Sequence, residues 1–179
     1  MTDVFGRLEP VPALDRPDLL ADPVRDAVAA HATDALVAPI DPAHADTEAL
    51  CAAYGVPIEA CANAVVVRGT RAGEERFAVC MTLAHRRVDV NGLVRRRLDA
   101  RKASFAPMDV AVAATGMEYG GITPVGAPAD WPVWVDDAVA EQDWVCIGSG
   151  IRGSKLFLPA SSLLALTGAE LVPDLARPV

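Results

Sequence analysis

The most informative stretch of the chain is residues 115–126, which reads TGMEYGGITPVG. Its centre is a pair of adjacent glycines followed shortly by a proline, in the order Gly120, Gly121, Ile122, Thr123, Pro124. Such a backbone turns sharply and approaches a ligand closely, with N–H groups free to point at an oxygen atom. The loop is not a Walker motif, because no Gly-Lys-Ser/Thr follows, and it does not open a helix after a strand as a dinucleotide fingerprint does. Taken alone, it is either an ordinary turn or a backbone site for an oxygen atom.

A second glycine-rich run, IGSGIRGS at residues 147–154, follows an apolar stretch. One interpretation is a hairpin loop between two strands. The alternative places Ser149 and Gly150 at the wall of a pocket.

The segments around these loops alternate between strand and helix patterns. Apolar and β-branched runs predict strands at residues 35–40, 64–68, 76–82, 132–135, 143–148, 155–158 and 169–173. Apolar spacing and capping residues predict helices at 23–33, from 46 or 47 to 54, 90–98, 107–114 and 160–167. Several strands are joined too tightly for parallel crossovers, so we expect an α+β fold with a mixed, partly barrel-like β-sheet surrounded by short helices.

Length and composition predict one domain over residues 1–179. The chain has 179 residues, of which 52% are hydrophobic, enough for one substantial core and too few for two ordinary domains. Residues 1–20 contain three prolines, which interrupt regular helices and strands, so we expect this proline-rich leader to lie along the surface. The apolar runs are far shorter than the roughly 20 residues that cross a bilayer, and the acidic start is unlike a signal peptide. We therefore expect a cytoplasmic protein with no membrane partner.

The four cysteines predict buried thiols rather than a metal site. Cys51, Cys61, Cys80 and Cys146 are scattered without a CxxC motif or a Cys/His cluster. Neither a metal nor a cofactor is expected.

The formal net charge of −8 argues against a protein that binds nucleic acid over its whole surface, because basic side chains dominate phosphate binding. DNA is therefore not an expected partner. One basic segment stands out between residues 86 and 102. It is either a solvated helix face or a local patch that receives an RNA backbone through Arg95, Arg96, Arg97 and Arg101.

Taken in order, these segments resemble the YbaK and prolyl-tRNA-editing insertion-domain family of aminoacyl-tRNA deacylases. The resemblance covers residues 35–173, and its most diagnostic motif is the GxxxP loop at 120–124. The matching segments are HADT at 44–47, a pair of strands, RRVD at 86–89, the GxxxP loop with Gly126, VDD at 135–137 and GSG at 148–150.

The resemblance implies a trans-editing hydrolase that cleaves the ester bond of a misacylated tRNA. Its partners would be the 3′ end of an aminoacyl-tRNA and, in addition, an aminoacyl-tRNA synthetase. Family members hold the ester carbonyl with backbone amides of the GxxxP loop, and donors of this kind contribute about 3 kcal/mol each. This assigns a catalytic role to Gly120, Gly121, Ile122 and Thr123, and substrate contacts to Pro124, Gly126, Ser149 and Gly150.

The family also carries an xHxxT element, which His44 and Thr47 match and which would shape the amino-acid pocket. Without that match, a lone histidine before a helix is a surface or capping residue. The adjacent Asp136 and Asp137 point to opposite faces of a strand, so they do not form a paired acid/base site, and one of them is expected to cap a helix.

One position departs from the family pattern. Active deacylases usually place a lysine at the start of the strand after the second helix, where this chain has Asn63; Lys102 and Lys155 do not align with it. Asparagine brings no charge, so the part played by a cation is either lost or supplied by an arginine. Three hypotheses follow: an editing hydrolase that uses Asn63, a catalytically silent binding protein for an aminoacyl, nucleotide or synthetase partner, and a hydrolase of a small ester unrelated to tRNA.

Overall fold

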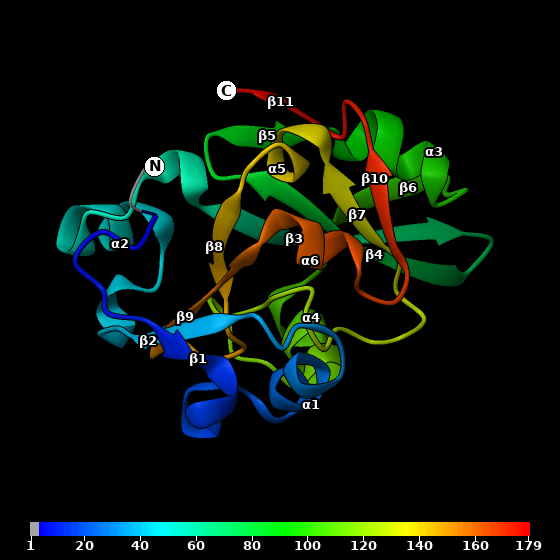
Figure 1. Cartoon of the computed structure of the whole chain (residues 1–179). Helices are drawn as coiled ribbons and strands as arrows, with labels where there is room; N and C mark the ends of the chain where they lie inside the picture. Colours follow the sequence, from blue (N-terminus) through cyan, green and yellow to red (C-terminus); the bar gives the residue numbers. More distant parts are fainter. Residues whose placement is uncertain (1–3) are drawn as a thin grey trace.

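The computed structural model describes residues 4–179, so the first three residues of the predicted leader lie outside the described part. In that part the strands form three sheets (Figure 1). The largest has five strands in the order β10 (Ala169–Val172), β7 (Val133–Asp136), β4 (Glu74–Leu83), β3 (Ala62–Arg71) and β6 (Lys102–Phe105). β3 pairs antiparallel with β4 and β6, whereas β4, β7 and β10 run parallel.

The second sheet has four antiparallel strands in the order β1 (Val11–Pro12), β2 (Leu36–Pro39), β9 (Ser154–Pro159) and β8 (Trp144–Gly148). It meets the first sheet at a single bridge between Cys61 and Cys146, and the two sheets do not close into a barrel. A third, two-stranded sheet pairs β5 (Arg86–Val88) with β11 (Ala176–Pro178). The expected α+β fold with a mixed sheet is therefore confirmed.

Short helices surround the sheets (Figure 1): α1 (Asp22–His31), α2 (Thr47–Tyr54), α3 (Arg95–Arg97), α4 (Met108–Thr115), α5 (Asp137–Ala140) and α6 (Ala160–Leu164). Among residues 4–179, no helix is long and apolar enough to span a membrane.

The ends of α2 and α4 follow from their capping residues. The Asp46 carboxylate accepts a hydrogen bond of 2.9 Å from the Ala49 amide, which satisfies a donor that the first helical turn leaves unpaired. Gly55 ends α2 and Gly116 ends α4 in the left-handed conformation, with φ of 72° and 67°. The predicted boundaries of α2 are confirmed, and α4 is shifted by one residue from the predicted range 107–114.

The largest core lies between the two main sheets and includes the inner face of α1. Val24 and Val28 of α1, Val37 of β2 and Leu156 of β9 are fully buried in it. Ala13, Leu19 and Leu20 of the predicted leader are buried there too, while residues 14–18 are exposed, so the leader is anchored to the core by a few side chains. A second core covers the other face of the five-stranded sheet and includes Leu98 and Trp134.

The β3–β4 hairpin is longer than predicted. Strands were predicted at 64–68 and 76–82, but the residues between them shrink to a tight turn at Ala72 and Gly73, both with positive φ, and Gly69 lies inside β3. A Cβ at Gly69 would stand 2.7 Å from the Cβ of Ala100, so this glycine lets the segment after α3 cross close over the strand.

Other elements also differ from the predictions. The helix expected at 90–98 is a π-helical turn at Val90–Val94 that continues into the short α3. β1, β5, β6 and β11 were not predicted, and for α5 only a capping aspartate was predicted.

Asp136 caps α5, as expected for one of the two adjacent aspartates. Its carboxylate accepts from the Ala138 amide, lies 3.2 Å from Arg86 Nε and accepts a 2.8 Å bond from the Ala176 amide of β11. The side chain is completely buried, and burial raises the pKa of Asp136. One carboxylate thus joins β7, β5 and β11.

Candidate functional site

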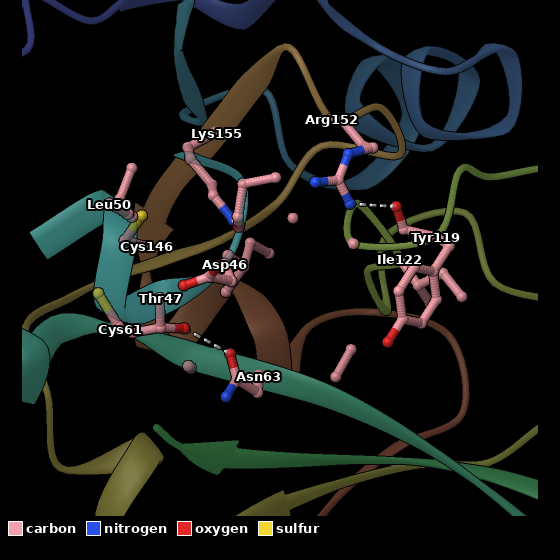
Figure 2. A pocket seen from close by; sticks show the side chains of 16 residues that line it. Asp46, Thr47, Leu50, Cys61, Asn63, Tyr119, Ile122, Cys146, Arg152 and Lys155 are labelled. Atoms are coloured by element: carbon pink, nitrogen blue, oxygen red, sulfur yellow. Dashed lines mark hydrogen bonds between the residues drawn. The ribbon is translucent and has the colours of Figure 1, made fainter. Parts of the chain in front are cut away.

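A cavity of about 450 Å³ lies where the two main sheets meet (Figure 2). Its walls come from the start of α2, the start of β3, the end of β8, the start of β9 and the loop after α4. The predicted site residues that line it are Thr47, Asn63, Gly120 and Ile122. The structure thus brings the GxxxP loop and the start of β3 to one cavity, although they are more than fifty residues apart in the sequence.

The GxxxP loop is fixed by hydrogen bonds that leave two cavity amides free. The Gly121 amide donates to Glu118 O at 2.9 Å, and the Gly121 carbonyl accepts from the Gly150 amide at 2.7 Å. The amides of Gly120 and Ile122 have no hydrogen-bond partner among the residues that the structure describes. Two N–H donors are therefore available at the cavity wall, while the donor of Gly121 is already used.

The other predicted loop residues lie outside the cavity lining and support the loop from behind. Gly126 and Gly150 pack so closely on the start of α1 that a Cβ on either would come within 2.4 Å of it or of the residue preceding it. Ser149 is buried, and its hydroxyl lies 2.7 Å from that of Ser154 across the β8–β9 hairpin. Thr123 and Pro124 are buried as well. A direct contact of these residues with substrate stays a prediction.

Asn63 and Thr47 form the polar rim of the cavity. The Thr47 hydroxyl donates to Asn63 Oδ1 at 3.2 Å, which leaves the Asn63 amide nitrogen available for a ligand (Figure 2). His44 is not part of the lining; its ring packs edge-on against Tyr54 with 5.7 Å between the centroids. His44 Nδ1 is buried without a hydrogen-bond partner among residues 4–179.

Lys155 lines the cavity, which sequence reasoning missed. Its side chain is only 8% exposed, and its ammonium points between the starts of α2 and β3 (Figure 2). Nζ donates a 2.6 Å hydrogen bond to the Ala45 carbonyl, just before α2. The available signal was a lone charge inside an otherwise apolar strand, SKLFLP. The cavity thus contains a lysine ammonium, carried by β9 rather than β3.

Arg152 braces the mouth of the cavity. Its guanidinium donates to Tyr119 O at 3.1 Å and to Pro42 O at 3.0 Å, and its amide donates to Glu118 Oε2 at 2.7 Å. Three loops that are distant in sequence are therefore held together. The Tyr119 ring, 57% exposed, stands on the opposite side of the opening from Lys155 (Figure 2).

The cavity floor carries two thiols, Cys61 and Cys146. Hydrogen bonding to Cys146 and burial raise the pKa of Cys61, and burial raises the pKa of Cys51 to about 11. The four cysteines are free, and all but the half-buried Cys51 are buried, as the sequence predicted. At neutral pH Cys61 remains a thiol and keeps this part of the cavity wall apolar.

The basic segment lies away from the cavity lining, and its arginines differ in their contacts. Arg97 pairs with Glu170 at 2.5 Å and stacks over Trp134 at 4.9 Å. Arg95 Nε donates to the Asn91 carbonyl at 2.9 Å, and Arg96 is exposed on α3. Arg101 is exposed beside a shallow hollow that it shares with Lys102 and Arg71. Arg97 is thus part of the fold, while Arg101 is available to a ligand.

Comparison with known proteins gives a family match over most of the chain. The model of a family described as the aminoacyl-tRNA editing domain matches residues 41–166. This range includes every residue named above as lining the cavity.

Solved structures share the fold. A candidate trans-editing enzyme for prolyl-tRNA synthetase superposes with a TM-score of 0.71 at 20% identity, over 86% of this chain and 94% of that one. A hypothetical protein superposes with a TM-score of 0.74 at 20% identity, over 87% of this chain and 100% of that one. A scaffold protein used for computational epitope grafting gives 0.72 at 21% identity, over 86% and 95% of the two chains.

Proposed function

Because the chain belongs to the aminoacyl-tRNA editing domain family, we propose that it is a trans-editing hydrolase, which removes a wrong amino acid from the 3′ end of a tRNA. Water adds to the ester carbonyl carbon, the bond from that carbon to the ribose oxygen breaks, and the ribose oxygen takes a proton. The products are the free amino acid and the uncharged tRNA. The proposal is carried by one observation, the two unpaired amides of Gly120 and Ile122 on the wall of the cavity.

These two amides suit the charge that develops in the reaction. When water attacks the ester, the carbonyl oxygen becomes an oxyanion, and fixed N–H donors stabilise it without reorganising. The hydrogen bond from Gly121 to Glu118 and the brace from Arg152 hold the loop in place before substrate arrives. Preorganised donors of this kind account for a rate enhancement without a covalent step.

The reaction that we propose uses water rather than a side-chain nucleophile. Cys61 lies in the cavity wall, but its raised pKa keeps it as a thiol, which is a poor nucleophile. The Asn63 amide nitrogen is available to a ribose hydroxyl or to the water, since its oxygen already accepts from Thr47. Holding water and ester together in the correct geometry supplies much of the rate in such a site.

A second candidate, a catalytically silent binding protein, is favoured by Asn63, which is uncharged where deacylases of this family usually carry lysine. Such a protein would use the same cavity to bind an aminoacyl or nucleotide group, or would dock on a synthetase. Binding and turnover distinguish the two functions.

The test is a panel of mischarged tRNAs incubated with the purified protein, with correctly charged tRNAs as the matched control. We expect release of the amino acid from at least one mispaired aminoacyl-tRNA and no release from its cognate pair. A panel that stays intact at high protein concentration, together with measurable binding of the same tRNAs, would replace the hydrolase by the binding protein. Such an enzyme works where aminoacyl-tRNA is made, in the cytoplasm, with a synthetase as its natural partner.

A further inference from the structure

The Lys155 ammonium lies in the cavity without an anionic partner. None of the ion pairs formed by the described residues includes it. Its one hydrogen bond goes to the Ala45 carbonyl, so up to two of its three N–H donors are unused. A buried charge in this state is unfavourable unless a ligand completes its contacts.

The groups around Lys155 do not neutralise it. The charged or titratable neighbours that affect it are Cys61, Cys146, Asp46 and Arg152. Asp46 favours the charged ammonium from a distance but forms no ion pair with it, Arg152 carries the same charge as the lysine, and Cys61 is a neutral thiol. Burial accordingly lowers the pKa of Lys155. The missing partner is therefore to be sought in the ligand.

Lys155 also lies close to the GxxxP loop, which we propose binds the carbonyl oxygen of the ester. It lies opposite Gly148 in the β8–β9 ladder. Gly148 packs beneath the carbonyls of Gly121 and Ile122, where a Cβ would come within 2.6 Å of both oxygens. Lys155 and the loop residues Gly120 and Ile122 therefore line one cavity from neighbouring strands and loops.

We propose that Lys155 is a positioning residue of the editing site, whose ammonium binds an oxygen atom of the aminoacyl ester and holds the ester against the loop amides. This inference rests on the proposed function. The same charge repels the α-ammonium of the substrate, while the Asp46 carboxylate attracts it, so the two side chains orient the aminoacyl group. After hydrolysis, the ammonium faces the carboxylate of the released amino acid.

The competing explanation is a structural role, in which Lys155 only satisfies the Ala45 carbonyl. Lys155→Gln separates the two, because glutamine keeps an N–H donor for that carbonyl but has no charge. Lys155→Arg keeps the charge. The matched control is Arg25→Gln, which removes one positive charge from the exposed face of α1, outside the cavity lining.

The experiment measures steady-state deacylation of the mischarged tRNA that the wild type hydrolyses best, together with thermal unfolding of each variant. In Lys155→Gln we expect KM to rise at least about tenfold, as for loss of a hydrogen bond to a charged group, with a smaller change in kcat. Lys155→Arg should recover part of the loss, and Arg25→Gln should match the wild type. Unchanged KM and kcat in Lys155→Gln would overturn the inference and leave the proposed function standing. A wild type that deacylates nothing would overturn both.

A second measurement covers the case in which Lys155→Gln does not fold. The chain has two lysines, Lys102 and Lys155, and Lys102 is exposed on β6. The wild type is acetylated with and without a saturating 3′-aminoacylamino-3′-deoxyadenosine that carries the amino acid it releases, and each lysine is followed by mass spectrometry. Binding at Lys155 lowers its labelling and leaves Lys102 unchanged. Equal labelling of Lys155 in both samples would contradict the inference.

Discussion

The guanidinium of Arg152 donates a 3.0 Å hydrogen bond to the carbonyl oxygen of Pro42, which joins the β8–β9 hairpin to the turn before α2. The same guanidinium holds the carbonyl of Tyr119, at the start of the GxxxP loop. Arg152 is half-buried and has no carboxylate partner for its guanidinium in the described residues. The mouth of the cavity is therefore held by a side chain bonded to two main-chain oxygens.

We predict that Arg152→Met lowers kcat/KM strongly and destabilises the fold by about 1–3 kcal/mol, because the main-chain oxygens of Pro42 and Tyr119 lose their hydrogen bonds to a charged group. Urea denaturation and deacylation assays measure the two effects. Arg152→Lys retains charge but not the fork of donors, so it should recover little activity. Full activity in Arg152→Met would mean that the loops at Pro42 and Tyr119 keep their positions without the hydrogen bonds from Arg152.

We predict that Gly121→Ala distorts the GxxxP loop and removes most of the deacylase activity. A Cβ at Gly121 would stand 2.6 Å from the carbonyl oxygen of Ile151, and overpacking of this kind is destabilising by about 1–3 kcal/mol. Gly153→Ala is the control in the neighbouring hairpin, because its nearest neighbour would be at 3.9 Å. Circular dichroism checks that both variants fold. Equal turnover in the two would reduce the loop to a simple turn.

We predict a pH dependence of stability that comes from Lys155. Its pKa is lowered in the folded protein from an ordinary value of 10.5, so the folded state binds fewer protons than the unfolded state between the lowered pKa and 10.5. The free energy of unfolding of the wild type should therefore rise, relative to Lys155→Gln, as the pH increases through that window. Urea titrations of both proteins at pH 7 and pH 10 test this. A constant difference would show that Lys155 titrates alike in the two states.

We predict that Asp136→Ala destabilises the protein by about 3–5 kcal/mol, since it leaves Arg86 without its partner and removes the acceptor of the Ala176 amide. Asp137→Ala is the matched control: its neighbouring carboxylate is only half-buried and should contribute less than about 1 kcal/mol. Chemical denaturation gives both values. Similar losses in the two variants would argue against a special role for Asp136.

We predict that two arginines of the basic segment differ in their effect on tRNA binding. Arg101→Glu should weaken binding and reduce the slope of log affinity against log salt by about 1, as for one lost phosphate contact. Arg97→Glu should mainly lower stability, because Arg97 contacts Glu170 and Trp134. Filter binding at several salt concentrations and thermal unfolding separate the effects. Unchanged affinity in Arg101→Glu would leave this segment as a solvated surface.

Local signals in the sequence predicted the helices that have strong caps and the strands that have apolar runs. Asp46 and Gly55 define α2 because each satisfies a helix end through its own side chain or backbone conformation. The extent of β3 was not predictable in this way, since Gly69 breaks the β pattern but is needed for close contact with Ala100. That contact depends on the tertiary fold.

In the candidate site, too, the sequence predicted what local motifs determine and missed what the tertiary fold determines. The order of motifs predicted the GxxxP loop and the start of β3 as one site, and both line the cavity. Lys155 could not be assigned, because its place in the cavity depends on its register opposite Gly148 and on the bridge between Cys61 and Cys146. Strand register is set by long-range pairing, which one sequence does not display.

The pairing of β11 with β5, and of β10 with β7, bears on how the protein is made. β7, the parallel neighbour of β4, and β10, the parallel neighbour of β7, follow the hairpin late in the chain, and the buried Asp136 receives a donor from Ala176, which comes later still. The site-bearing hairpin β3–β4 emerges from the ribosome long before these strands; it lacks a neighbour beside β4 until β7 is made, and β7 in turn lacks one until β10 is made. Newly made chains therefore remain incomplete until residues 169–178 have left the exit tunnel, and stalled translation upstream of them would yield chains prone to aggregation.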